Sequence, residues 1–180
     1  MSSSIPTAID APRWWPWLLL SIAVVIVDQL SKHAVLAMLR PAEERAVTSF
    51  FSFVLAFNAG AAFSFLGNAS GWQRYLFSAF ACAASAVIVV LLKRGGSKTY
   101  CAALSLILGG ALGNLWDRAT LGRVVDFILV HDFLPRRLPG AAWFDPFPAF
   151  NVADSAITIG AVLLILDSFR QRPTRAAKPH

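Results

Sequence analysis

Four long apolar blocks, separated by Pro, Gly and charged residues, constrain this chain more than any other feature. An apolar α-helix needs about 20 residues to cross the ~30 Å hydrocarbon core of a bilayer. The segments of that length are Trp14–Leu39, Trp72–Leu92, Thr99–Arg118 and Phe150–Phe169. Of the 180 residues, 57% are hydrophobic and only 14% are charged, against about 45–50% and 25% in soluble domains. The sequence therefore predicts an all-α polytopic membrane protein, with 1–180 forming one domain of four transmembrane helices.

The charged and sulfur-containing residues exclude several classes of protein. Lys and Arg outnumber Asp and Glu by 16 to 10, but half of the basic residues cluster at Arg13, in the 93–98 loop and from Arg170 onward. No basic helix or aromatic RNA-reading motif accompanies them, so we expect no nucleic-acid partner. Cys82 and Cys101 lie inside apolar blocks, and two cysteines provide neither a disulfide framework nor a four-ligand zinc site. We expect both to be small core residues.

The distribution of basic residues also predicts the orientation in the membrane. The 93–98 loop and the tail from Arg170 are rich in Lys and Arg, whereas the two longer loops mix Arg with Asp and Glu. By the positive-inside rule, both termini and the 93–98 loop are cytoplasmic. The unusual polar residues then gather near the outer leaflet: Asn58, Gly60, Asn114, Asp117, Arg118, Asn151 and Asp154.

Two segments are expected outside the membrane. In the first, Phe51, Phe53, Leu55 and Phe57 recur with a period of two, which predicts a strand with one apolar face and a short extracytoplasmic sheet. The second runs over 119–149, and its latter half contains four Pro residues among aromatic ones. This composition is typical of a loop anchored at the lipid headgroups rather than of one continuous helix.

Ionisable residues inside membrane spans are costly and are functional candidates. Asp28 and Lys32 are four residues apart on one helix face, so a structural ion pair is the favoured interpretation. For Asp117 and Arg118, a helix-end ion pair and a supporting role in an active site remain equally open. Asp154 follows Asn151 by three residues near a helix N-terminus, where capping alone could account for it.

Asp126 stands out because it lies within a β-branched and aromatic run, VVDFI. Two carboxylates that converge from separate elements and share one proton are what an aspartic protease requires: one activates water and the other protonates the substrate. Asp126 and Asp154 fit that requirement. The three histidines are isolated, and no zinc-protease or serine-hydrolase motif is present. We therefore expect carboxylate chemistry with no metal and no cofactor.

Five blocks of the sequence resemble those of lipoprotein signal peptidase, the bacterial signal peptidase II family. They are VDQLSK (27–32), NAGAAFS (58–64), GGALGNLWDR (109–118), VVDF (124–127) and FNVADS (150–155). The resemblance implies an aspartic endopeptidase of the bacterial inner membrane that removes the signal peptide from diacylglyceryl-modified prolipoproteins, cutting before the lipid-modified Cys. It also implies four helices, an extracytoplasmic sheet with a mobile helix or loop, contact with membrane lipids, and inhibition by the cyclic peptide globomycin.

The resemblance assigns roles to individual positions. Asp126 and Asp154 match the catalytic dyad. The positions that shape the pocket or hold the substrate are matched by Asn58, Gly60, Asn114, Arg118, Asn151 and Ala153. Asp28, Lys32 and Asp117 match supporting positions. The gap between Asp126 and Asp154 is longer than the family pattern, which leaves the conformation of the 131–149 loop open.

Two other classes of function remain as alternatives. Intramembrane carboxylates also mark ion pathways, so a small proton-coupled carrier or channel subunit is one. A carrier normally has its site at the bilayer midplane, however, whereas these acids gather at the outer ends of the helices. The other alternative is a structural assembly factor that contains helix-end ion pairs only.

Overall fold

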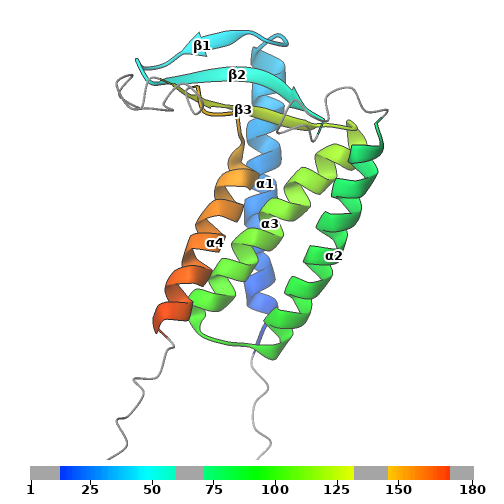
Figure 1. The fold of residues 1–180 in the computed structure, drawn as a ribbon, viewed down its shortest axis with the longest axis vertical. Coiled ribbons are helices and arrows are strands. Elements are labelled where there is room, and N and C mark those ends of the chain that lie inside the picture. Colours follow the sequence, from blue (N-terminus) through cyan, green and yellow to red (C-terminus); the bar gives the residue numbers. More distant parts are fainter. Residues whose placement is uncertain (1–12, 60–70, 132–145, 171–180) are drawn as a thin grey trace, which may run out of the picture.

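The computed structural model describes residues 13–59, 71–131 and 146–170. A small sheet lies across one end of a helical bundle (Figure 1). The helices are α1 (Trp15–Met38), α2 (Trp72–Arg94), α3 (Lys98–Thr120) and α4 (Val152–Arg170). The strands are β1 (Glu44–Ala46), β2 (Phe51–Asn58) and β3 (Val124–Val130). All four helices are long and apolar enough to cross a membrane, so the predicted fold class is confirmed.

Helix α3 lies at the centre of the bundle and packs against α1, α2 and α4. Half of its most apolar window is buried inside the protein, compared with 22% in each of the other three helices. Those three helices expose large apolar side chains such as Ile22, Phe80 and Val162, as expected for surfaces that face lipid. Cys101 is buried as predicted, but the prediction for Cys82 is wrong, because this residue is on the exposed surface of α2.

Two glycines let α3 approach its neighbours closely. A Cβ atom on Gly113 would lie 2.6 Å from Oδ2 of Asp28 on α1, and one on Gly110 would collide with the carbonyl oxygen of Ala153 on α4. Small residues at such positions allow helix backbones to come together within a membrane. The predicted packing role of these glycines therefore has a specific consequence: α3 meets α1 and the first turn of α4 at one level.

The sheet is antiparallel, with the strand order β1-β2-β3. The pairing of β2 with β3 shifts register between Phe53 and Ala56, which is the mark of a β-bulge. Because of this shift, the prediction of one continuous apolar face on β2 is wrong. Ser52 and Leu55 are buried, while Phe53 is exposed.

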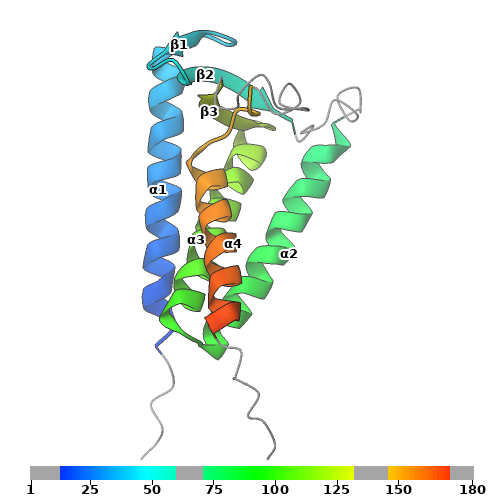
Figure 2. The ribbon, with the colours of Figure 1, turned by 60° about the vertical axis from the view of Figure 1, so that its left-hand side comes forward.

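The chain before α4 runs along β3. Phe150 pairs with Ile128 in an isolated antiparallel bridge, and the Phe150 carbonyl accepts from the N–H of Ile128 at 2.8 Å. This pairing brings the start of α4 beside β3. An apolar cluster joins the sheet to the C-terminal end of α1, and it consists of Val35, Leu39, Leu55, Val125 and Phe127. Helix α2 leans away from α1 at the sheet end of the bundle (Figure 2).

Candidate active site

The two predicted dyad residues come from different elements that meet where the sheet joins the bundle. Asp126 lies on β3 opposite Ala56 of β2, and only 2% of its surface is exposed. Asp154 lies in the first turn of α4 and is partly exposed. A buried acid on a strand thus faces the same region as a more accessible acid at a helix N-terminus.

A bridge of two amide side chains links these carboxyl groups. Asn151 Nδ2 donates to Asp126 Oδ1 at 2.8 Å and to Asn114 Oδ1 at 3.1 Å. Asn114 Nδ2 in turn donates to Asp154 Oδ1 at 2.8 Å. The chain of contacts Asp126–Asn151–Asn114–Asp154 therefore supplies each carboxyl group with an amide donor.

The start of α4 is held by reciprocal capping. Asn151 Oδ1 accepts from the Asp154 N–H at 2.9 Å, and Asp154 Oδ2 accepts from the Asn151 N–H at 3.3 Å. This is the capping-box arrangement, with Asn and Asp as its two members. Helix α4 consequently begins at Val152, two residues later than the span predicted from the sequence. Asp154 both caps the helix and reaches the amide bridge, so capping does not account for all of its contacts.

The environment of Asp126 favours its neutral form. Burial, followed by the nearby charge of Asp154, raises the pKa of Asp126 from 3.8 to about 7. Hydrogen bonds from Asn58 and Asn151 and the charge of Lys32 act in the opposite direction. A carboxyl group with a pKa close to neutrality can give or take a proton at physiological pH.

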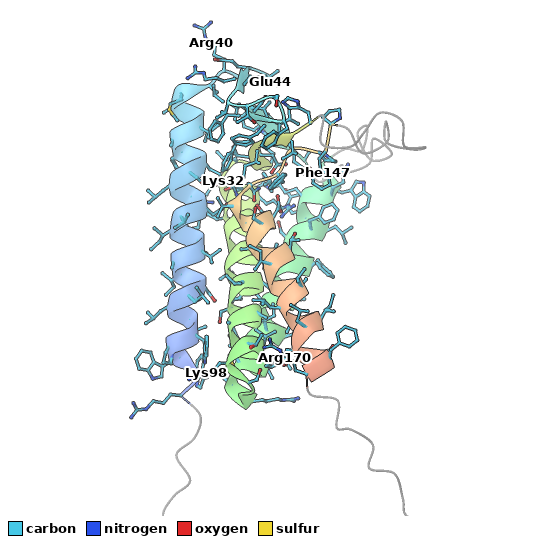
Figure 3. All side chains as sticks on the ribbon, turned by 90° about the vertical axis from the view of Figure 1, so that its left-hand side faces the viewer. Lys32, Arg40, Glu44, Lys98, Phe147 and Arg170 are labelled. Atoms are coloured by element: carbon cyan, nitrogen blue, oxygen red, sulfur yellow. The ribbon has the colours of Figure 1, made fainter. Side chains whose placement is uncertain are left out.

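Beneath the dyad, Lys32 contacts more than the single partner that was predicted. Its Nζ lies 2.8 Å from Asp28 Oδ2 and 2.9 Å from Asp117 Oδ2, and it donates to Asn114 Oδ1 at 3.1 Å. Figure 3 shows Lys32 among the helices close below the sheet. The predicted ion pair of Asp28 with Lys32 is present. Of the two interpretations left open for Asp117 and Arg118, the helix-end ion pair between them is not what forms. Asp117 pairs with Lys32 instead.

Arg118 and Asn58 both lie close to the dyad. Arg118 Nη1 donates weakly to the Asn114 carbonyl at 3.4 Å, and its guanidinium group lies 5.5 Å from the centre of the Phe77 ring. Its buried Nε has no hydrogen-bond partner within the described parts of the chain. The Asn58 side chain hydrogen-bonds the Asp126 carboxyl group.

Of the remaining predicted positions, the structure describes Ala153 but not Gly60. Ala153 is fully buried, and its N–H donates to Asp28 Oδ1 at 2.9 Å. Gly60 and most of the 131–149 loop fall outside the described residues. One contributor was missed: Gln29 Nε2 donates to Asp117 Oδ1 at 2.8 Å and to the Gly113 carbonyl at 3.2 Å. Its polarity inside an apolar span was the signal that could have revealed it.

Comparisons with known proteins show the family of this chain. Residues 20–170 match the family described as Signal peptidase (SPase) II. The chain belongs to the signal peptidase II family. Curated relatives named lipoprotein signal peptidase include one from Pseudomonas fluorescens, 52% identical over 164 residues, or 89% of this chain and 91% of the relative. Another, from Pseudomonas aeruginosa, is 52% identical over 165 residues, or 90% and 92% of the two chains.

Solved structures show the same likeness. A bacterial membrane enzyme determined by the in meso method at 2.3 Å resolution has a TM-score of 0.74 and 28% identity, covering 92% of this chain and 94% of its own. A second such structure, at 1.9 Å resolution, has a TM-score of 0.73. The predicted family and enzyme class are confirmed. Because signal peptidase II enzymes are peptidases, a carrier or channel subunit and an assembly factor no longer compete as interpretations.

Proposed function

We propose that Asp126 and Asp154 are the catalytic dyad of this signal peptidase II. The reaction is hydrolysis of the peptide bond before the diacylglyceryl-modified Cys of a prolipoprotein, which releases the signal peptide. The observation that carries this proposal is the amide bridge between the two carboxyl groups, through Asn151 and Asn114. It gives two acids from separate elements a common hydrogen-bonded frame, as a proton-sharing pair needs.

The surroundings of the two acids suggest how the proton is divided. Asp154 lies at the N-terminus of α4, where the helix dipole stabilises a negative charge, and it accepts from Asn114 and the Asn151 N–H. Asp126 is the more buried acid, with a pKa of about 7. In our scheme Asp154 takes a proton from the attacking water while Asp126 protonates the carbonyl oxygen of the substrate.

The substrate-holding positions follow from the family resemblance and from the free donors of the site. We assign the pocket to Asn58, Gly60, Asn114, Arg118, Asn151 and Ala153. Among these residues, Arg118 has the clearest structural reason for its assignment, because its Nε has no hydrogen-bond partner within the described residues. Because Ala153 is fully buried, its contribution is to let α4 pack closely rather than to touch the peptide. Membrane lipids and a globomycin-type cyclic peptide are the further ligands that we propose.

The orientation is also a proposal. Lys98 and Arg170 lie at the end of the bundle away from the sheet (Figure 3), as do Lys93 and Arg94 in the last turn of α2. We place this basic end in the cytoplasm by the positive-inside rule. The sheet and the dyad then lie at the outer leaflet of the inner membrane, on the side where a translocated prolipoprotein emerges.

A cleavage assay tests the proposal directly. Purified protein in detergent is mixed with a diacylglyceryl-modified prolipoprotein peptide and with the same peptide lacking the lipid. We expect cleavage of the lipidated peptide before the modified Cys, and no loss of activity in EDTA, because carboxylates alone supply the acid and the base. Loss of activity in EDTA that added zinc restores would contradict the aspartic mechanism.

A further inference from the structure

The contacts of Lys32 suggest a task beyond neutralising Asp28. Its ammonium group has three N–H donors, and the structure supplies three acceptors at 2.8, 2.9 and 3.1 Å: Asp28 Oδ2, Asp117 Oδ2 and Asn114 Oδ1. The side chain is only 1% exposed. Every donor is used, so the position of the ammonium group is fixed from three sides.

Each acidic partner of Lys32 holds the backbone next to one dyad residue. Asp117 Oδ2 accepts from the N–H of Val125, the residue before Asp126, at 3.1 Å. Asp28 Oδ1 accepts from the N–H of Ala153, the residue before Asp154, at 2.9 Å. A simple ion pair would not need this correspondence. Through the two carboxylates, Lys32 is connected to the backbone on both sides of the dyad.

The third partner connects Lys32 to a dyad side chain. Because an ammonium group can only donate, it requires the oxygen of the Asn114 amide to face it. The Nδ2 of Asn114 is thereby turned toward Asp154, to which it donates at 2.8 Å. Lys32, together with the Asn151 amide that donates to the same oxygen at 3.1 Å, thus determines which end of the Asn114 amide reaches the dyad.

We infer that Lys32 is a positioning residue that sets the relative placement of the two dyad aspartates through Asp28, Asp117 and Asn114. This inference rests on the proposed function of Asp126 and Asp154. It assigns Lys32 no contact with substrate. Since a misplacement of about 1 Å can cost 10²-fold in rate, loss of the Lys32 contacts should act on turnover rather than on substrate capture.

The test begins with Lys32→Met, which keeps a long unbranched side chain but removes the charge and all three donors. We measure turnover on the monodisperse protein fraction, so that misfolded molecules do not contribute. We expect kcat to fall about 100-fold, with KM within about threefold of the wild type. We expect a pair of acids to give a bell-shaped pH profile of kcat. This profile should move to higher pH in Lys32→Met, because the charge of Lys32 lowers the pKa of Asp126 and the substitution removes that charge. Among the described residues, the other charged groups that act on the dyad or on its neighbour Arg118 are Asp28, Asp117 and Arg118 itself, and this substitution leaves them in place.

A matched control separates positioning from stability. Asp167→Asn changes another buried carboxyl group of the bundle, at the opposite end of α4. It should reduce the yield of folded protein but leave kcat, KM and the pH profile of the folded molecules as in the wild type. If Lys32→Met behaves in the same way, Lys32 is only a structural residue and the inference is wrong.

If Lys32→Met does not fold, a second variant tests the same inference. The double variant Lys32→Met/Asp28→Asn removes one positive and one negative charge together, and its reference is Asp28→Asn alone, in which the side-chain oxygen can still accept from Ala153. We expect kcat of the double variant to be about tenfold or more below that of its reference. Equal kcat values would overturn the inference.

Asp154→Asn, assayed in parallel, shows which proposal has failed. If Asp154→Asn is inactive while Lys32→Met keeps wild-type turnover and pH profile, the dyad stands and only the role of Lys32 is wrong. If Asp154→Asn itself retains turnover, the dyad assignment fails, and the positioning role fails with it.

Discussion

The two ends of the α3–α4 pair each bury a carboxylate, and they do so in different ways. At the end away from the sheet, Asp167 is 4% exposed and accepts from the Ser97 hydroxyl at 2.6 Å. Ser97 also caps α3, accepting from the Tyr100 N–H. At the sheet end, Asp126 is 2% exposed and shares its surroundings with a second acid, Asp154. No second carboxylate accompanies Asp167 in the described part of the chain.

Burial of an acid therefore does not by itself indicate an active site. Asp167 lies beside the N-terminus of α3, where a negative charge is favourable, and its contact with Ser97 fastens α4 to α3. Asp126 and Asp154 receive amide donors instead, and the Asn114 side chain links the ammonium group of Lys32 to Asp154. Under the proposed function, the sheet end therefore holds a carboxyl pair with a transferable proton, whereas the opposite end holds a structural contact.

The largest expected effect comes from removing either dyad acid. Asp126→Asn or Asp154→Asn should lower kcat by 10³-fold or more, because the general acid and base steps each supply about 10²–10⁴-fold and act as a unit. Asp167→Asn should change kcat per folded molecule by less than about threefold. The measurement is cleavage of the lipidated peptide by each purified variant. Comparable losses in all three variants would erase the distinction between the two ends.

An intermediate effect is expected from a matched pair of glycines. A Cβ on Gly113 would lie 2.6 Å from Asp28 Oδ2, and one on Gly160 would lie 2.6 Å from Ile107 Cγ1. Gly113→Ala and Gly160→Ala should both lower the melting temperature, because both sites are closely packed. Only Gly113→Ala should also lower kcat, by about tenfold or more, since it displaces the Asp28 carboxylate, which contacts Lys32 and the Ala153 N–H. Equal kcat values for the two variants would contradict this expectation.

The smallest effect concerns stability and pH. Folding raises the pKa of Asp126 from 3.8 to about 7. Ionisation of Asp126 therefore lowers the free energy of unfolding by its full amount above about pH 7, and this loss of stability shrinks as the pH falls toward 4. Inactive Asp126→Asn should therefore melt a few degrees above the wild type at pH 8, with a smaller gap at pH 5. Thermal unfolding in detergent measures both values. A difference in melting temperature that does not depend on pH would show that ionisation of Asp126 does not oppose folding.

Much of the fold could be predicted from the sequence because its signals are local. Apolar block lengths gave the four spans, and Asp126 stood out as an acid in a β-branched run. Beyond Asp28, the hydrogen-bond network around Lys32 could not be predicted in this way. Asp117 and the N–H groups of Val125 and Ala153 come from distant parts of the chain, and their meeting depends on how α1, α3 and β3 pack. The β2 bulge was missed for the same reason, since it arises from pairing with β3.

Titration of the dyad tests most directly whether two carboxyl groups share a proton at the sheet end of the bundle. Infrared or carboxyl-¹³C NMR spectra of the purified protein in micelles would be recorded across pH 3–9, with Asp126→Asn used to assign the signal of Asp126. We predict that Asp126 titrates near pH 7 and that its pKa falls in Asp154→Asn, because the charge of Asp154 contributes to the upward shift. A carboxyl group that titrates near pH 4, with no response to Asp154→Asn, would contradict the account.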